Sequence, residues 1–132
     1  QEHALMYVLD TSVVLSYLLN PKRLGPKTQR IIRETRMLQF SAISVAEIFV
    51  KQLLGKLKLD SPMIEVVSEF GLTPLGFDFE MAAELATLGT MIGLDPFDRM
   101  ITATAKSLSA SLITSDRQLL SLGFDWILDS AH

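Results

Sequence analysis

Short apolar segments recur along this chain, and each leads through polar residues into a segment with helical periodicity. The segments expected to form strands are 6–9, 38–41, 72–75, 111–114 and, at the edge, 124–128. The segments expected to form helices are 13–19, 27–36, 44–54, 60–70, 79–92, 96–109 and a short one ending at 123. Apolar strands that alternate with helices are typical of a parallel sheet covered on both faces. The pattern therefore predicts an α/β fold, a three-layer α/β/α domain.

The chain has 132 residues, and we expect one domain over 6–130. Met6 looks like a natural start, so we interpret 1–5 as a remnant of cloning and His132 as the possible beginning of a tag. No apolar run approaches the roughly 20 residues that span a bilayer. No signal peptide is apparent either. These observations predict a cytoplasmic protein with no membrane association.

The composition removes several kinds of chemistry. The chain has no cysteine, which excludes disulfides, zinc–thiolate sites and thiol nucleophiles. Its two histidines, His3 and His132, lie at the ends of the chain, which excludes a histidine triad or base inside the domain. Any chemistry must therefore use carboxylates, hydroxyls, lysine, arginine or a bound metal.

Four acidic residues stand out by their positions. Two follow strands, where functional sites of α/β proteins form, and two lie on apolar helix faces, where a carboxylate is costly to bury. Asp10 and Asp116 follow apolar strands, and the carboxyl ends of parallel strands are where α/β proteins place their sites. Glu47 and Asp98 interrupt apolar faces of helices, where an unpaired carboxylate costs several kcal/mol. Lys51 lies one helical turn from Glu47, so an ion pair is possible there.

Each acid also has a simpler interpretation. Asp10, Asp95 and Asp116 stand where helix N-caps would stand, and Glu47 could be a paired or rim-exposed acid. Taken together, however, clustered carboxylates repel one another, and a divalent cation relieves that repulsion. Oxygen ligands in a chain without cysteine or internal histidine favour Mg²⁺ or Mn²⁺.

Four segments make this chain resemble the PIN-domain family, specifically the VapC-type toxins of toxin–antitoxin systems. They are Val8-Leu9-Asp10-Thr11-Ser12, Ser44-Val45-Ala46-Glu47-Ile48, the stretch from Asp95 to Ala105 that begins Asp-Pro-Phe-Asp-Arg, and Ile113-Thr114-Ser115-Asp116. They occur in the family's order, with family-like spacing. The resemblance implies a PIN fold with a five-stranded parallel sheet.

The resemblance also implies an activity and its residues. Asp10, Glu47, Asp98 and Asp116 match the family's catalytic acids, which hold one or two Mg²⁺ or Mn²⁺ ions. Asp95 is a further candidate ligand, ranked below Asp98. Thr11 and Thr114 match supporting hydroxyls, and Ser115 does so more weakly. The implied reaction is hydrolysis of RNA phosphodiester bonds by metal-activated water. The implied partners are an RNA substrate, a second copy in a homodimer and a cognate antitoxin.

Basic residues gather in one part of the chain, although the net charge is −3. Six of the twelve lie between 22 and 36, and Arg30 and Arg33 belong to this group. They could form a solvated helix face, contact RNA phosphates or contact an acidic antitoxin tail. Arg99, beside Asp98, is another candidate RNA contact. The alternative functions are a PIN nuclease of RNA processing or decay and a non-catalytic PIN-like binding module.

Overall fold

One five-stranded sheet forms the centre of the molecule. The computed structural model describes residues 6–60 and 62–132. The strands are β1 (Tyr7–Leu9), β2 (Leu38–Ser41), β3 (Thr73–Leu75), β4 (Ser111–Thr114) and β5 (Ile127–Asp129). Their order is β3-β2-β1-β4-β5, and every neighbouring pair is parallel. The predicted α/β class and parallel sheet are confirmed. Residues 1–5 lie outside the described part, so their interpretation as a cloning remnant stays a prediction.

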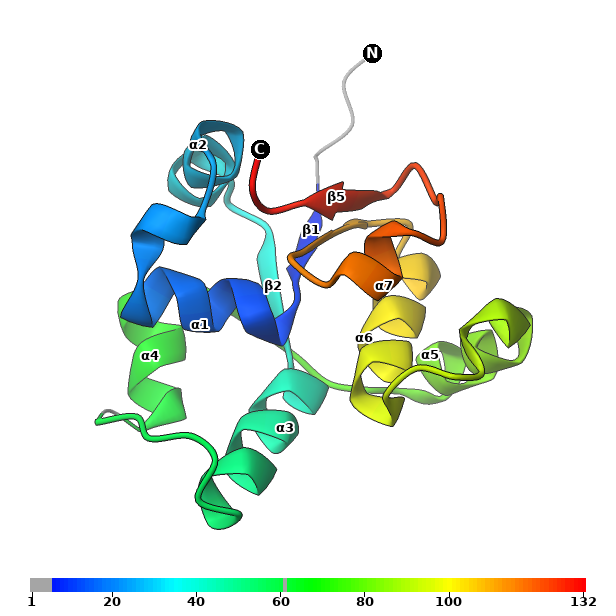
Figure 1. The fold of residues 1–132 in the computed structure, drawn as a ribbon, viewed down its shortest axis with the longest axis horizontal. Coiled ribbons are helices and arrows are strands. Elements are labelled where there is room, and N and C mark those ends of the chain that lie inside the picture. The colour runs from blue at the N-terminus through cyan, green and yellow to red at the C-terminus, as the bar shows by residue number, and fades with distance from the viewer. Residues whose placement is uncertain (1–5, 61) are drawn as a thin grey trace.

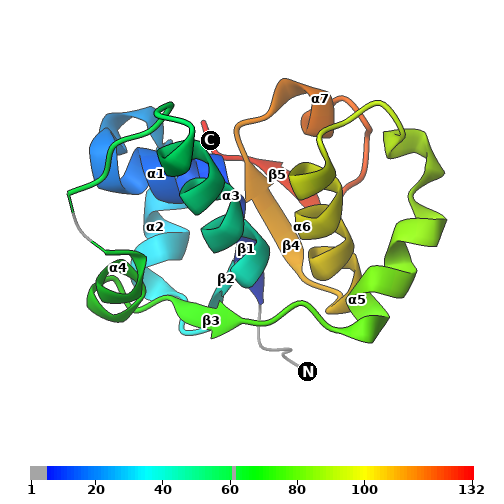
Figure 2. The ribbon, with the colours of Figure 1, turned by 90° about the horizontal axis from the view of Figure 1, so that it is seen from below.

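Helices cover both faces of the sheet (Figures 1 and 2). They are α1 (Thr11–Leu19), α2 (Pro26–Glu34), α3 (Ala42–Leu53), α4 (Met63–Glu69), α5 (Phe79–Glu84), α6 (Pro96–Ser107) and α7 (Arg117–Leu120). Short 3₁₀ turns are η1 (Pro21–Arg23), η2 (Leu85–Thr87) and η3 (Gly89–Met91). Among these helices, none is both long enough and apolar enough to cross a membrane.

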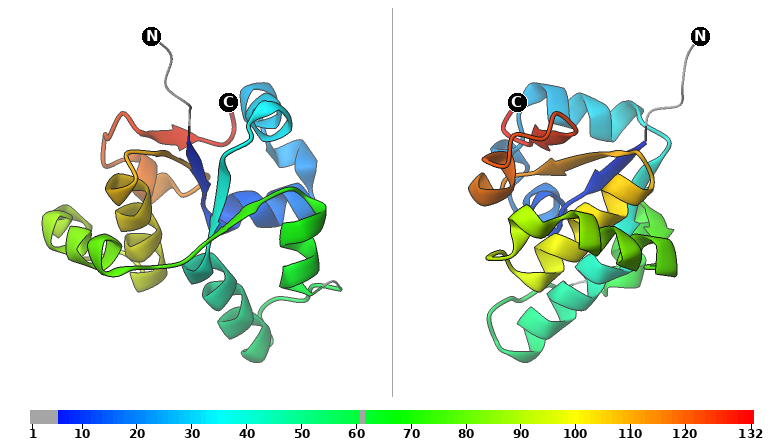
Figure 3. Two further views of the ribbon diagram at one scale, coloured as in Figure 1. Left: turned by 180° about the vertical axis from the view of Figure 1, so that it is seen from behind. Right: turned by 90° about the vertical axis from the view of Figure 1, so that its right-hand side faces the viewer.

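The core has two parts because side chains alternate across a strand. Leu9 and Ile113 belong to the part that contains buried residues of α1, α2 and α4. Val8 and Leu112 belong to the part that contains buried residues of α6, α7 and η3. The two halves of the molecule are visible on either side of the strands when the ribbon is viewed from behind (Figure 3). Strands buried on both faces explain why these segments are apolar throughout.

The predicted helix 79–92 is wrong in its length. The helix ends at Glu84, and two 3₁₀ turns replace its second half. This change turns Leu88 and Met91 inward, where both are buried. Leu88 and Met91 thus pack into the core with buried residues of α6 and α7 from short 3₁₀ turns instead of from one continuous helix.

The predicted cap of the third helix is also wrong. The helix begins at Ala42, and its N-cap is Ser41, whose hydroxyl accepts a hydrogen bond from the Ile43 N–H at 3.0 Å. Ser44 instead lies buried inside the first turn. Other boundaries differ by a few residues, as helix ends commonly do. The first helix starts at Thr11 instead of 13, and the last strand is 127–129 instead of 124–128.

The last residues of the chain pack against the start of α2. The Gly25 N–H donates to the Ser130 carbonyl oxygen and the Thr28 N–H donates to the His132 carbonyl oxygen, both at 2.9 Å. A Cβ at Gly25 would clash with the backbone of Ala131 and His132, so this approach requires glycine. Because Ser130 directly follows β5, α2 begins at the carboxyl edge of the sheet.

Candidate metal centre

The two acids that follow strands come together through a shared threonine. Asp10 follows β1 and Asp116 comes shortly after β4, and these strands are parallel neighbours. The Thr114 hydroxyl donates to Asp10 Oδ2 at 2.6 Å and accepts a hydrogen bond from the Asp116 N–H at 3.0 Å. The supporting position predicted for Thr114 therefore links the two turns that carry these acids.

Asp10 is a buried carboxyl group with a fixed orientation. Its Oδ1 accepts from the Thr11 N–H at 2.9 Å, and only 3% of the residue is exposed. Burial raises the pKa of Asp10, and the nearby Glu47 and Asp116 carboxylates raise it further, although the hydrogen bonds from Thr114 and Thr11 oppose this shift. A carboxylate here requires compensation that the surrounding hydrogen bonds do not fully provide.

Glu47 on α3 is buried while apolar residues near it on the same helix are not. Its exposed fraction is 6%, whereas Val50 and Leu54, which follow it at helical spacing, are 41% and 63% exposed. The predicted ion pair is confirmed, because Lys51 Nζ lies 3.0 Å from Glu47 Oε2. The other oxygen, Oε1, is buried and has no hydrogen-bond partner among the described residues. Buried polar atoms almost always have a partner, so this oxygen is suited to a ligand.

Asp95 and Asp98 reach the same place from the start of α6. Carboxylate oxygens of Glu47, Asp95 and Asp98 lie within 4.8 Å of one another. Burial raises the pKa of Asp98 to about 7, and Asp10, Asp116, Glu47 and Asp95 add to the shift through like-charge repulsion. The structure therefore brings all five predicted acids into one electrostatically coupled group, called the acid cluster below.

The capping interpretation of three of these acids is correct as well. Asp10, Asp95 and Asp116 are the N-caps of α1, α6 and α7. In Asp95 and Asp116 the capping hydrogen bonds use Oδ1, from Phe97 and from Gln118 and Leu119. The other oxygen of each carboxylate has no hydrogen bond among the described residues. Capping and ligand binding can therefore use different oxygens of one side chain.

The donor set fits a hard divalent cation. All candidate ligand atoms are carboxylate oxygens, which Mg²⁺ and Mn²⁺ accept. A bound cation would give Glu47 Oε1 a partner and would offset both the burial and the like-charge repulsion that raise the pKa of Asp98. Asp95 and Asp98 both lie in the group with Glu47, and the ranking of Asp95 below Asp98 stays a prediction.

The hydroxyls of Ser44 and Ser12 belong to the hydrogen-bond network around the acids, and the sequence analysis did not single them out. The Thr11 hydroxyl donates to Ser44 Oγ at 2.9 Å, which connects α1 to α3 near the acids. The Ser12 hydroxyl donates to Asp10 Oδ2 at 3.4 Å and accepts from the Ser115 N–H at 3.4 Å. Ser115, predicted as a supporting hydroxyl, is exposed and takes part through its backbone. The sequence signal for Ser44 was its position one helical turn before Glu47, which places the two residues on the same face of the helix.

The three predicted RNA contacts occupy two places: Arg99 follows Asp98 on α6, and Arg30 and Arg33 lie on α2. Arg99 is half-buried, and its Nε has no hydrogen-bond partner among the described residues. It lines a hollow between α6 and η2 together with Leu85 and Leu88. Arg30 and Arg33 are exposed on α2. Their roles in RNA binding stay predictions.

A parallel sheet with carboxylates gathered at its carboxyl edge defines a class of α/β proteins suited to bind a divalent cation. Within that class the family is specific: residues 7–125 match the model of the PIN domain, and the chain belongs to the PIN domain family. A comparison with curated protein sequences finds no significant match.

Solved structures share the fold across almost the whole chain. A DNA-bound VapBC from Salmonella typhimurium is 22% identical, with a TM-score of 0.67 over 95% of this chain and 96% of its own. VapBC2 from Rickettsia felis bound to a promoter DNA fragment is 16% identical, with a TM-score of 0.65 over 95% and 97%. VapBC-5 from Mycobacterium tuberculosis is 20% identical, with a TM-score of 0.58 over 96% and 98%.

Proposed function

We propose that this protein is a Mg²⁺- or Mn²⁺-dependent endoribonuclease of the VapC toxin type, which hydrolyses RNA phosphodiester bonds. The observation that supports it most is the convergence of Asp10, Glu47, Asp95, Asp98 and Asp116, which come from four separate parts of the chain. A purely structural role does not account for a buried Glu47 oxygen that lacks a partner among the described residues.

Glu47, Asp95 and Asp98 would hold the cation, with Asp10 and Asp116 completing the set. A bound Mg²⁺ or Mn²⁺ supplies Lewis acidity, which lowers the pKa of water and offsets charge developing on a phosphodiester. Such catalysis needs no histidine, in agreement with the composition. The chain's own residues then have to keep the carboxylates ionised, oriented and close together.

Hydrogen bonds and helix ends provide that support. Thr114 and the Thr11 N–H fix both oxygens of Asp10, and Lys51 neutralises part of the charge of Glu47. The N-termini of α1, α6 and α7 begin at Asp10, Asp95 and Asp116, and the partial positive charge of a helix N-terminus favours a nearby anion. These hydrogen bonds and helix ends therefore orient the carboxylates that would hold the cation.

The direct test replaces Asp98 with asparagine and measures cleavage of structured RNA with Mn²⁺ or Mg²⁺. We expect D98N to lose at least about 100-fold in rate, because one charged ligand of the cation is removed. D125N is the matched control, since Asp125 is exposed and lies outside the acid cluster. Undiminished cleavage by folded D98N would contradict the proposal.

A thermal-unfolding titration with Mn²⁺ tests the site without measuring activity. At about 100 times its Kd, a ligand that binds only the folded state stabilises it by about 2.7 kcal/mol. We expect Mn²⁺ to stabilise wild type and D125N by this amount, which is measured as a rise in Tm. D98N should be stabilised much less. An equal rise in all three proteins would mean that the cation binds elsewhere.

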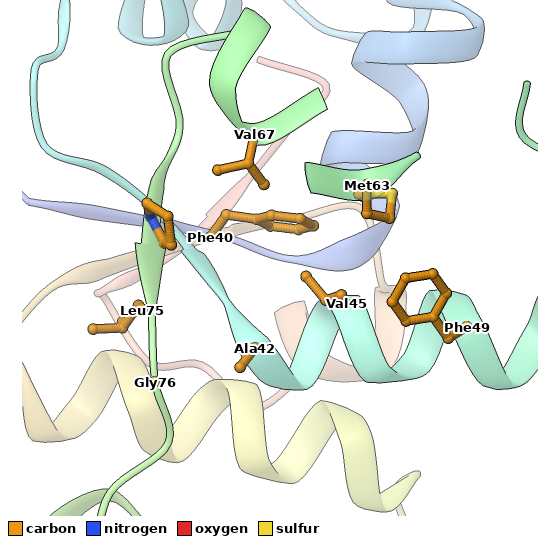
Figure 4. Close-up of a pocket in the computed structure, with 9 residues that line it drawn as sticks. Phe40, Ala42, Val45, Phe49, Met63, Val67, Leu75 and Gly76 are labelled. Atoms are coloured by element: carbon orange, nitrogen blue, oxygen red, sulfur yellow. The ribbon is translucent and has the colours of Figure 1, made fainter. Parts of the chain in front are cut away.

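The regulation proposed for this nuclease is inhibition by a cognate antitoxin, in a homodimeric toxin. The similar VapBC structures are complexes bound to DNA or members of toxin–antitoxin systems, which supports this proposal. The chain also offers an apolar groove of about 400 Å³, lined by residues of β2, α3, α4 and β3, among them Phe40, Phe49 and Met63 (Figure 4).

A PIN nuclease of RNA processing or decay remains the competing proposal. A small neighbouring gene for a DNA-binding protein that binds this chain and stops RNA cleavage would support the toxin. A nuclease without such a gene would favour the alternative. A non-catalytic binding module is the third possibility, and it predicts no Mn²⁺ uptake at the acid cluster.

A further inference from the structure

Six of the twelve basic residues of this protein lie on one exposed segment. Residues 20–37 contain six basic side chains and a single acid, Glu34. All six are exposed, and we call them the basic ridge. They are Lys22, Arg23, Lys27, Arg30, Arg33 and Arg36.

Basic side chains elsewhere in the molecule are often paired with the protein's own carboxylates. Lys51 lies 3.0 Å from Glu47, and Lys106 Nζ lies 3.7 Å from a Glu84 oxygen. Arg117, the residue after Asp116, lies 2.6 Å from Asp129. None of the six side chains of the basic ridge forms an ion pair within the part of the chain that the structure describes. Lys51, Lys106 and Arg117 are therefore partly neutralised, and the cations of the ridge are available to a ligand.

The basic ridge begins close to the acid cluster and leads away from it. α2 starts at the carboxyl edge of the sheet, beside Ser130 and the chain end (Figure 1). Lys27 lines a small hollow with Asp129, which pairs with Arg117 next to Asp116. From there, Arg30 and Arg33 follow Lys27 at intervals of three residues, so they are neighbours along one side of α2.

We infer that the basic ridge binds the phosphate backbone of the RNA substrate outside the cleavage site. This inference rests on the proposed function. A substrate held only at the acid cluster would meet a group of carboxylates on a protein with a net charge of −3. Cations that bind the RNA at a distance from that cluster supply the missing attraction, and they do so without reading the base sequence.

The same surface fits an acidic protein segment less well. Protein interfaces are anchored by apolar and aromatic side chains in their centre. The exposed large apolar side chains of the described residues include none between 20 and 37. A surface of charge without apolar anchors is typical of phosphate-backbone binding, where affinity comes from the release of counterions.

The test measures how RNA binding depends on salt, in the presence of EDTA so that no metal-dependent hydrolysis occurs. The probe is a fluorescent oligouridylate of about 20 nucleotides, titrated with wild-type protein between about 50 and 200 mM potassium chloride. Each phosphate contact on single-stranded RNA contributes about −0.7 to the slope of log K against log salt concentration. We expect R30Q/R33Q to reduce the magnitude of this slope by about 1.4 and R30K/R33K to keep it.

A matched control separates local contacts from net charge. K56Q/K58Q removes the same two charges from exposed positions after α3, and its slope should equal that of wild type. Equal slopes for R30Q/R33Q and K56Q/K58Q would overturn the inference. So would an unchanged RNA slope in R30Q/R33Q accompanied by lost binding of poly-L-glutamate, which would assign the ridge to an acidic protein.

Failure of this inference can be distinguished from failure of the proposed function. A reduced slope in R30Q/R33Q without any RNA cleavage by wild type would contradict the nuclease proposal and support the basic ridge as a phosphate-binding surface. RNA cleavage that depends on Asp98, with an unaltered slope in R30Q/R33Q, would support the nuclease and contradict the ridge.

Discussion

The two sides of α3 differ sharply in chemistry. One side carries Glu47 into the acid cluster, where burial of a carboxylate is costly. Val45 and Phe49, each about half a turn away, line the apolar groove with Phe40 and Met63 (Figure 4). Twelve residues of helix thus carry both a charged site and an apolar surface. The comparison teaches that burial of Glu47 is not explained by apolar packing, and the proposed cation site supplies a reason for it.

The largest expected effect is on the rate of RNA cleavage, which substitutions on the two sides of α3 should change to different extents. E47Q should lose at least about 100-fold in the rate of RNA cleavage, because the cation loses a charged ligand. F49A removes a half-exposed ring on the groove side and should stay within about threefold of wild type, as expected for a residue that contacts no reacting group. Initial rates with Mn²⁺ measure both.

The free energies of unfolding of E47Q and F49A should rank in the opposite order to their activities. Without metal, E47Q should unfold in urea at a free energy equal to or above that of wild type, because its side chain has no buried charge. F49A should lose about 1 kcal/mol of apolar packing. A stable and active E47Q protein would remove the functional distinction between the two sides.

The next effect concerns the support of the acid cluster. T114V keeps the shape of the side chain but removes the hydrogen bond to Asp10 Oδ2, and it should cost about 1.5–3 kcal/mol, as hydrogen bonds to charged groups do. T90V, at an exposed threonine, should change stability by less than about 0.5 kcal/mol. Urea unfolding of both variants gives the comparison. A T114V protein as stable as T90V would show that Asp10 needs no support from this hydroxyl.

The smallest effect is a dependence of stability on pH. The pKa of Asp98 is raised from 3.8 to about 7 in the folded protein. Between these values the folded state holds a proton that the unfolded state has released, so stability falls as pH rises. Because Asp98 is partly solvated, we expect metal-free wild type to lose about 1–2 kcal/mol between pH 4 and 8.

Two variants localise this pH dependence. D98N should give a shallower curve, with the remaining slope coming from Asp10, whose pKa is also raised. F49A, on the groove side, should keep the wild-type slope at a lower overall stability. Curves of equal slope for wild type and D98N would show that Asp98 does not hold the proton.

The strands and the acids that follow them could be predicted from the sequence because both signals are local. A buried parallel strand needs several consecutive apolar residues, as in Tyr7-Val8-Leu9, and its carboxyl end needs a polar turn. Asp10 and Asp116 therefore mark the site edge without any knowledge of tertiary contacts. Asp98 follows from an equally local pattern, since it interrupts an otherwise apolar face of α6.

The sequence by itself thus indicated the alternation of strands and helices, the chemistry available and the five candidate acids, with Asp95 ranked below the other four. Only the tertiary structure decided how they combine. Thr114 meets Asp10 across 104 positions of sequence, Asp95 joins Glu47, and Leu88 and Met91 break a periodic helix by turning inward. The physical reason is that periodicity reports on neighbours within one element, whereas burial and repulsion depend on which other elements cover each side chain.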